Sequence, residues 1–444
     1  MSSRRRGSPN IRLLDARMRL TSPSGSGRPM SRQELAEAAN AYLWERHQRR
    51  ASLDGNYIGK LERGDHRWPQ PIYREALRAV LGATADADIG FYVMRAHPHH
   101  TRDASLGVGG APARVVRQED QHPPRQTTAD LVNALLTPAI SGDAEPATAD
   151  ALTRLATRAW RLRQAAQYAA LSQLLPSLLI QAETSKGSLS GTDEERAVRV
   201  LAHTYNAASS LLRRVGDEQL ALVAADRAVR AASTLDDPVL VAAARYRLAN
   251  VLLSGNRVDA AKTVALHAAD LTSPSRSHTP RSVAVWGGLL LTAAVAAARA
   301  QAESQAWELM GEAKAGARIL GTDHADIYAI FGPTNLAIHG VQVAVELGDG
   351  RDAVRRSHAV HVARLPASLR ERRSQFLTDV AHGHVLTNND AEAIAALLEA
   401  ERVAPEEIRL SGQVRSMTET MLSRERTGAV PELRRLAATI GLTR

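Results

Sequence analysis

Four side chains in the stretch Leu53 to Gly64, which reads L-D-G-N-Y-I-G-K-L-E-R-G, are of types that proteins use to contact nucleic acid. They are Asn56, Tyr57, Lys60 and Arg63. Amides and hydroxyls bond base edges, while cations neutralise phosphates. We therefore assign base reading to Asn56 and Tyr57, a further DNA contact to Lys60, and phosphate contact to Arg63.

The same stretch predicts the helix that would position these side chains. Asp54 is a good N-cap, because its carboxylate can accept from the free amides of the first turn. Leu53, Ile58 and Leu61 recur at near-helical spacing and would seat the helix on a small core. Gly64 can take the left-handed geometry that ends a helix. An ordinary amphipathic helix with a glycine stop is the alternative interpretation.

The ending I-G-K-L-E-R-G resembles the I-S-x-I-E-R-G signature of the Cro/C1-type (XRE) helix-turn-helix repressors. The resemblance implies that residues 53–64 form a recognition helix. Ahead of it, M-S-R-Q-E-L-A-E-A-A at residues 30–39 is similar to the scaffold helix of that family. There Ser31 and Glu34 have the spacing of a capping box.

The chain departs from that family between Asn40 and Ser52, where thirteen residues replace the usual tight turn. We expect the scaffold helix to continue to about His47 and a basic turn to follow. In that turn Arg49 and Arg50 are candidates for phosphate contact, although they could equally form a solvated face. The effect of the Asn40–Ser52 insertion on helix-turn-helix geometry stays open.

Flanking helices complete a predicted DNA-binding domain at residues 11–94, after a disordered basic start at residues 1–10. The first helix spans Ile11 to Leu20, with Ile11, Leu14 and Met18 as its expected inner stripe. The last spans Ile72 to Leu81. Residues 1–82 carry 16 Lys and Arg against 8 Asp and Glu, which is +8 of the net +9 of the whole chain. This concentration favours a polyanionic partner, double-stranded DNA, at that end.

Composition indicates an all-α protein of two or more domains. Hydrophobic residues make up 44% of the 444, aromatic residues only 4%, and there is no Cys. The start M-S-S-R-R-R lacks the apolar stretch of a secretory signal, and we expect a buried helix rather than a membrane span at Val283 to Ala298. The expected location is cytoplasmic, with no membrane partner.

A Pro- and Gly-marked linker is predicted at residues 95–127, followed by helix pairs over residues 128–444. The pairs repeat an apolar helix, a turn, and a second helix rich in alanine. Expected turns lie at Gly216, Gly255, Gly348 and Asn388–Asn389, and a degenerate copy surrounds Trp286. The alanine stripes are Ala221, Ala225, Ala228; Ala261, Ala265, Ala268; Ala353; and Ala393, Leu397, Ala400.

These units resemble tetratricopeptide repeats, which implies an α-solenoid with a concave surface. An irregular helical bundle is the alternative. Asn206, Asn250 and Asn335 fall in first helices, where the resemblance implies a concave position, and an amide can donate to and accept from a peptide at once. With Tyr246 they are the candidate effector-binding residues. Each asparagine could instead satisfy a local backbone group.

Sequence patterns for catalysis or metal binding are missing. No H-E-x-x-H, P-loop, G-x-S-x-G or paired-cysteine motif occurs, so we predict no catalytic residues, cofactor or metal site. The His97–His100 group has no supporting carboxylates.

Two functions fit the sequence. The chain resembles actinobacterial regulators that join an XRE-type DNA-binding domain to a tetratricopeptide-like sensor. That resemblance implies a transcriptional regulator, not an enzyme, which responds to a peptide or small-molecule effector. A homodimer is expected, since one small domain usually needs a second half-site. The alternative is a protein-interaction scaffold whose basic end binds nucleic acid nonspecifically.

Overall fold

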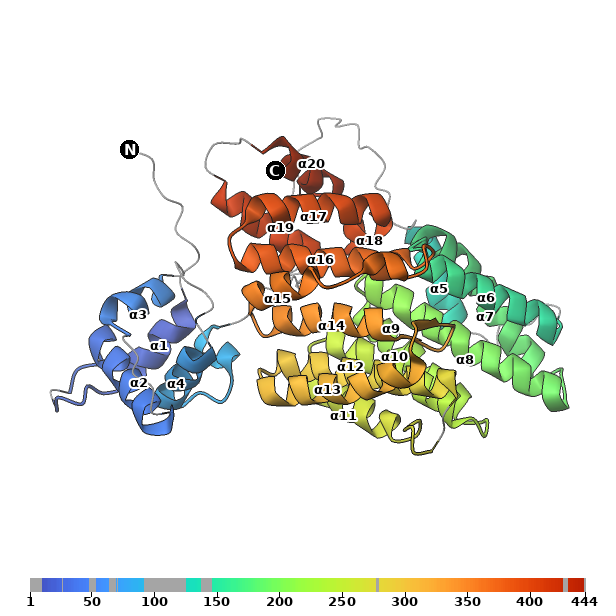
Figure 1. Cartoon of the computed structure of the whole chain (residues 1–444), viewed down its shortest axis with the longest axis horizontal. Helices are drawn as coiled ribbons and strands as arrows, with labels where there is room; N and C mark the ends of the chain where they lie inside the picture. Colours follow the sequence, from blue (N-terminus) through green and yellow to red (C-terminus); the bar gives the residue numbers. More distant parts are fainter. Residues whose placement is uncertain are drawn as a thin grey trace, which may run out of the picture. The chain divides into compact units, whose positions relative to one another are not determined.

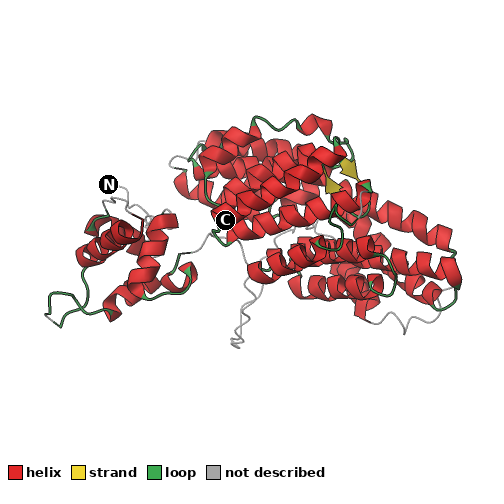
Figure 2. Ribbon diagram, turned by 60° about the horizontal axis from the view of Figure 1, so that its bottom comes forward, coloured by secondary structure: helices red, strands yellow, loops and turns green. Residues whose placement is uncertain are grey.

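The computed structural model describes residues 10–25, 27–47, 53–63, 69, 71–91, 125–136, 146–276, 279–425 and 430–442. The chain divides into two compact units, Met1–Arg95 and Ala96–Arg444. Within the described residues the regular structure is helical apart from one short hairpin (Figures 1 and 2). Several predicted features lie outside these ranges: residues 1–9 of the predicted basic start, the segment Gln48–Ser52, Gly64, and residues 95–124 of the predicted linker with its His97–His100 group. The last three residues of that linker, 125–127, belong to a helix instead.

The small unit contains four α-helices and one 3₁₀ turn within the described residues. They are α1 (Ile11–Arg19), α2 (Arg32–His47), α3 (Gly55–Glu62), α4 (Pro71–Leu81) and η1 (Asp86–Ile89). The predicted capping box is confirmed at the start of α2: Ser31 N donates to Glu34 Oε2 over 2.7 Å, and Glu34 N to Ser31 Oγ over 3.2 Å. The continuation of α2 to His47 is also confirmed.

The predicted inner stripe of α1 is wrong. Ile11 and Met18 are 61% and 48% exposed, whereas the buried residues are Leu13 and Arg17. Asn10 fixes this rotation: its Oδ1 accepts from Leu13 N at 3.1 Å and its Nδ2 donates to the Ile89 carbonyl at 3.0 Å. Asn10 is thus part of the folded unit and not of a disordered start. The buried face of α1 includes the charged residue Arg17, which a search for apolar spacing does not select.

The large unit is a series of helix pairs followed by shorter helices. The pairs are α6 (Ala149–Gln164) with α7 (Tyr168–Lys186), α8 (Gly191–Arg214) with α9 (Glu218–Ala232), α10 (Pro238–Ser254) with α11 (Val258–Ala269), α12 (Pro280–Arg299) with α13 (Glu303–Leu320), α14 (Pro333–Glu346) with α15 (Gly350–Ser357), and α16 (Arg370–Leu386) with α17 (Asp390–Val403). The remaining elements are α5 (Arg125–Leu136), β1 (His324–Ala325), β2 (Ile330–Phe331), η2 (Val362–Arg364), α18 (Pro405–Leu410), α19 (Gly412–Arg424) and α20 (Pro431–Thr439). In Figure 1, α12, α14, α16 and α17 lie one above another.

All six pairs close with the same turn. One residue takes a left-handed φ, and the N–H of the next residue donates over 2.9 Å to the carbonyl five residues earlier, as in a Schellman motif. The left-handed residues are Ala166, Gly216, Asn256, Gln301, Gly348 and Asn388. At the second expected turn Gly255 keeps φ −76°, and Asn256 is the left-handed residue instead.

The alanine stripes behave as predicted: each of these small side chains is fully buried between helices. A methyl group lets two helices approach closely. The first four pairs share one core, whereas Ala353 lies in a second cluster and Ala393, Leu397 and Ala400 lie in a third. The left-handed residues recur at intervals of 40 to 50 residues, and this uneven period explains why the repeat is weak in the sequence.

Helix α12 is the centre of the large unit. It is apolar and long enough to span a membrane by length and composition alone, but the segment Val283–Ala298 is buried throughout, so the prediction of a core helix is confirmed. The hairpin β1–β2 packs against it (Figure 2). Because Gly287 has no side chain, the Phe331 ring can lie directly on the helix backbone.

We predict that Gly287→Ala destabilises the large unit, because the added methyl group would overlap the Phe331 ring. Overpacking of this kind costs about 1–3 kcal/mol. Thermal unfolding followed by circular dichroism measures the loss. Gly311→Ala is the control, since its methyl group would meet open space on the exposed side of α13 and favours helix. Equal melting temperatures for the two variants would contradict this account of α12.

Candidate functional site

Helix α3 begins and packs as the sequence predicts. Asp54 is the N-cap, and its carboxylate accepts from Tyr57 N over 2.7 Å. Leu53, Ile58 and Leu61 are buried in the core of the small unit. The helix therefore turns one face inward and leaves the opposite face outward.

Polar contacts to α2 fix the entry into α3 despite the intervening segment. The Asn40 amide bonds both backbone groups of Leu53, donating to its carbonyl over 2.8 Å and accepting from its N–H over 3.0 Å. Gln33 Oε1 accepts from Gly55 N at 2.9 Å. Side chains of α2 thus take over the positioning that a tight turn would otherwise provide.

The far end of α3 is held by a buried ion triad. Glu62 pairs through Oε1 with Arg17 of α1 and through Oε2 with Arg32 of α2, both at 2.6 Å. Arg17 also donates to the Met30 carbonyl over 2.6 Å. The Glu62 and Arg17 side chains are 3% and 8% exposed, whereas Arg32 is 47% exposed. Three helices therefore meet at one carboxylate.

The residues predicted to contact DNA are not equally exposed in this structure. Asn56 and Lys60 are exposed on α3. Tyr57 is partly buried against Tyr73, edge to face, with ring centroids 5.9 Å apart. Burial raises the pKa of the Tyr57 phenol to about 12. Arg63 is the half-buried C-cap residue, and Arg49 and Arg50 lie outside the described residues.

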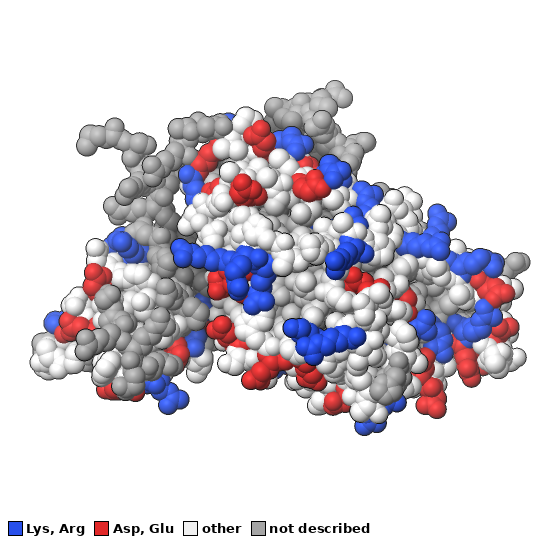
Figure 3. Space-filling view, viewed as in Figure 1, with Lys and Arg blue, Asp and Glu red and all other residues white. Residues whose placement is uncertain are grey.

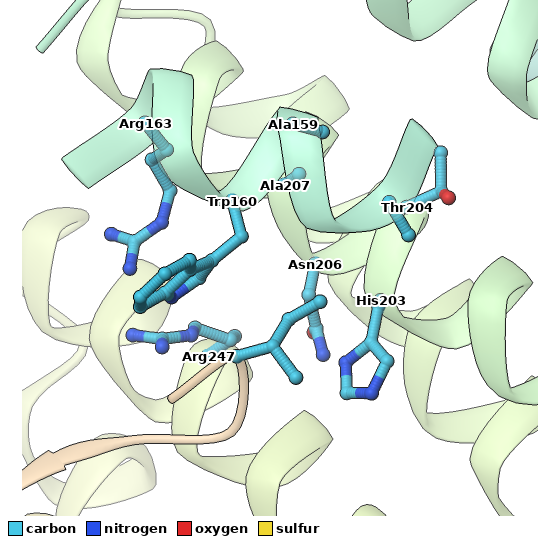
Figure 4. Close-up of a pocket in the computed structure, with 10 residues that line it drawn as sticks. Ala159, Trp160, Arg163, His203, Thr204, Asn206, Ala207 and Arg247 are labelled. Carbon is cyan, nitrogen blue, oxygen red and sulfur yellow. The ribbon is translucent and has the colours of Figure 1, made fainter. Parts of the chain in front are cut away.

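In the large unit a cavity opens between α6, α8, α10 and the hairpin loop. About 320 Å³ of space here, open solvent included, is not filled by protein atoms, and about 20 Å³ of it can hold the centre of a water molecule. Polar lining comes from Trp160, Arg163, His203, Asn206 and Arg247. In Figure 4 the Trp160 indole lies between the guanidinium groups of Arg163 and Arg247, and His203 and Asn206 enter from α8. The sequence argument did not select this set apart from Asn206.

The cavity is a cationic site with a neutral histidine. Burial, and then the charge of Arg199, lowers the pKa of His203 to about 3; its ring lies edge to face with Tyr328, centroids 4.8 Å apart. Burial, and then the charge of Arg163, lowers the pKa of Arg247 to about 10. Arg163 and Arg247 therefore supply the positive charge of the cavity, because His203 is neutral.

The candidate effector asparagines are not brought together. Asn206 lines the cavity, is 8% exposed, and its Oδ1 has no partner among the described residues. Asn250 instead donates to the Tyr246 carbonyl of its own helix, and Asn335 to the Ile330 carbonyl, both over 2.9 Å. They lie ten, six and thirteen residues before the left-handed residues of their turns. By helical period they project from similar sides of their helices, but at different distances from the turn. Tyr246 packs under Arg247, with the guanidinium carbon 4.7 Å from the ring centroid.

Residues far apart in sequence meet in a cluster of buried charges. Tyr168 at the start of α7 donates to Glu407 of α18. Arg214 of α8 pairs with Glu407 at 2.8 Å and with Glu371 of α16 at 3.3 Å. Arginines inside alanine-rich first helices were the available sequence signal for this cluster and for the cavity, because a large charged side chain is out of place in such a helix.

Comparison with known proteins adds little to this picture. No family model matches the chain, and no curated protein matches it. Among solved structures, a Rap protein complexed with competence and sporulation factor is 13% identical with TM-score 0.42, covering 66% of this chain and 88% of that one. BtubC (BKLC) from P. vanneervenii is 15% identical with TM-score 0.34, covering 55% and 90%. At such TM-scores neither likeness carries weight for fold or function.

We predict that Arg17→Met costs the small unit about 3 kcal/mol, because it leaves a buried carboxylate short of one partner. Arg32→Met should cost about 1 kcal/mol or less, since Arg32 is half exposed and solvent screens its charge. Hydrogen exchange of α1–α4 peptides in the full chain measures both values. A cost for Arg32→Met as large as that for Arg17→Met would show that Glu62 does not depend on the buried pair.

We also predict an acid sensitivity of the large unit that His203→Gln removes. The pKa of His203 is depressed from 6.5 to about 3, so stability is full above pH 6.5 and falls as protons bind the unfolded chain between pH 6.5 and 3. The loss at pH 5 relative to pH 7 is about 2 kcal/mol. Burial raises the pKa of Asp379 to about 7, which acts in the opposite direction.

The measurement is therefore the difference in unfolding free energy between wild type and variant, in which the contribution of Asp379 cancels. His361→Gln, at an exposed position, is the control. A pH slope that His203→Gln leaves unchanged would refute the buried neutral histidine.

Proposed function

We propose that the protein is a sequence-specific DNA-binding transcription regulator, whose small unit reads DNA and whose tetratricopeptide-like helical unit binds a peptide or small-molecule effector. The observation that carries the proposal is helix α3: it exposes Asn56 and Lys60 while its other face is buried and both its ends are anchored. A short helix held in this way can enter a major groove without losing its orientation.

The distribution of charge supports DNA binding by the small unit rather than by the large one. Residues 83–444 hold 40 Lys and Arg against 39 Asp and Glu. On the face shown in Figure 3, cationic and anionic side chains are intermixed over the large unit. An electrostatic footprint for phosphates is therefore expected at the N-terminal end.

The helical unit supplies the regulatory half of the proposal. Its cavity is lined by polar side chains whose hydrogen-bonding and charge capacity the protein itself does not use up, as at Asn206 Oδ1. An effector regulates only if it binds one state of the protein better than another. A homodimer would place two small units on two half-sites, and effector binding would then alter their spacing or freedom.

We predict that Asn56→Ala/Lys60→Ala loses specific DNA binding. Genome-wide mapping of bound DNA yields the operator, and fluorescence anisotropy on that operator measures affinity. Loss of one base contact costs about 1–3 kcal/mol, roughly a 5- to 150-fold weaker Kd. Lys314→Ala, an exposed lysine of α13, is the control and should bind like wild type.

Two results would count against the proposal. Unchanged operator binding by the folded double mutant would remove α3 as the reading element. Binding that disappears with competitor DNA and falls steeply with salt at every sequence would favour the nonspecific scaffold instead.

A further inference from the structure

Cations outnumber anions inside the large unit. Two acids, Glu371 and Glu407, form one cluster with the arginines that act on them or on each other electrostatically: Arg163 (α6), Arg213 and Arg214 (α8), Arg247 (α10) and Arg372 (α16). Arg214 is the one that forms ion pairs with these acids within the described residues, and it pairs with both. Arginines therefore outnumber carboxylates in this cluster.

Arg163 and Arg247 are the two members of this cluster that line the cavity. Neither forms an ion pair with a carboxylate in the part of the chain that the structure describes. Arg247 donates to the Tyr328 carbonyl at 3.4 Å. With the Gln164 amide turned so that its oxygen faces them, that oxygen accepts from Arg163 and, at 3.1 Å, from the Trp160 indole. Neutral oxygens orient the two guanidiniums, and the charge of Glu371 attracts both of them, although the ion pair of Glu371 is with Arg214.

Burying like charges side by side is unfavourable unless a counter-charge is present. Burial, and then the charge of Arg163, depress the pKa of Arg247, and the charge of Glu371 opposes this only in part. Both side chains remain partly accessible, so an anion from solution can reach them. Guanidinium groups bind carboxylates through paired N–H donors.

The rest of the cavity specifies what should accompany the anion. Trp160, Ala159, Ala207 and Ile327 form an apolar wall beside the two arginines. Asn206 Oδ1, buried and without a partner in the described structure, can accept one N–H or O–H. An isolated inorganic anion would leave both of these features unused.

We propose that this cavity binds the carboxylate of an amphiphilic ligand: Arg163 and Arg247 hold the carboxylate, Trp160 packs against an apolar group, and Asn206 accepts a hydrogen bond from the ligand. The inference rests on the proposed effector role and names the chemistry of the effector. Two sources share this chemistry, the C-terminal residue of a peptide and a free apolar acid.

The test measures ligand binding to the full chain without DNA, by melting temperature and titration calorimetry. The probes are N-acetyl-L-phenylalanine, its neutral amide, the peptide N-acetyl-Gly-Gly-Phe and inorganic phosphate. At ten times Kd a carboxylate probe should raise the melting temperature by about 2 °C, and the amide should not. A peptide that binds at least tenfold more tightly than the single residue indicates a peptide terminus, and the reverse indicates a free acid.

Variants locate the site. Arg163→Gln and Arg247→Gln should each weaken carboxylate binding at least tenfold, and Asn206→Ala should weaken N-acetyl-L-phenylalanine several-fold. Arg318→Gln, at an exposed position of α13, is the matched control and should bind like wild type. Melting temperatures of the ligand-free variants check that each variant still folds.

The proposal is overturned if the acid and its amide behave alike on wild-type protein up to 20 mM, if phosphate alone stabilises it, or if the arginine variants bind as wild type does. The comparison of acid with amide needs no variant, so it holds even where a variant unfolds. A failure of DNA binding by the small unit would leave these results untouched, which separates the two proposals.

Discussion

One backbone hydrogen bond, repeated in six turns, underlies the large unit. In each turn the N–H of the residue after the left-handed one donates to the carbonyl five residues earlier. This bond fixes the relative direction of the two helices of a pair. Four of the six left-handed residues, Ala166, Asn256, Gln301 and Asn388, are not glycine. Such a backbone costs about 1–2 kcal/mol for an ordinary residue, so the packing of the alanine stripes must offset it. Turn geometry and helix packing therefore stabilise each other.

Packing between the first helices of distant pairs has an electrostatic consequence. Helix α6 contacts α16, so that the charges of Arg163 and Arg247 act on Glu371, which is ion-paired with Arg214. Burial raises the pKa of Glu371, but the charges of Arg163 and Arg214 lower this pKa by more, so the acid stays ionised. An anion in the cavity would act on the same charges that join α8 to α16 and α18.

The small unit achieves order by a different route. Its core is modest, and the buried triad of Arg17, Glu62 and Arg32 joins three helices at the end of α3. A paired buried carboxylate specifies orientation more than it adds stability, because desolvation consumes much of the attraction. That specificity suits a helix whose exposed side chains must be presented at a fixed angle. Glu62 lies within the motif I-G-K-L-E-R-G.

The sequence by itself determined the local structure: the Asp54 and Ser31 caps, the extent of α2 and α3, the alanine stripes and the buried α12 all follow from short-range chemistry and helical period. Only the tertiary structure decided which faces and charges meet. It rotated α1 so that Arg17 is buried, placed the hairpin β1–β2 on Gly287, and brought Arg163 to Arg247 across 84 positions of sequence. Helical period fixes which residues share a face of one helix. The partner of that face depends on how all the pairs curve together, because no single pair can bury its surfaces alone.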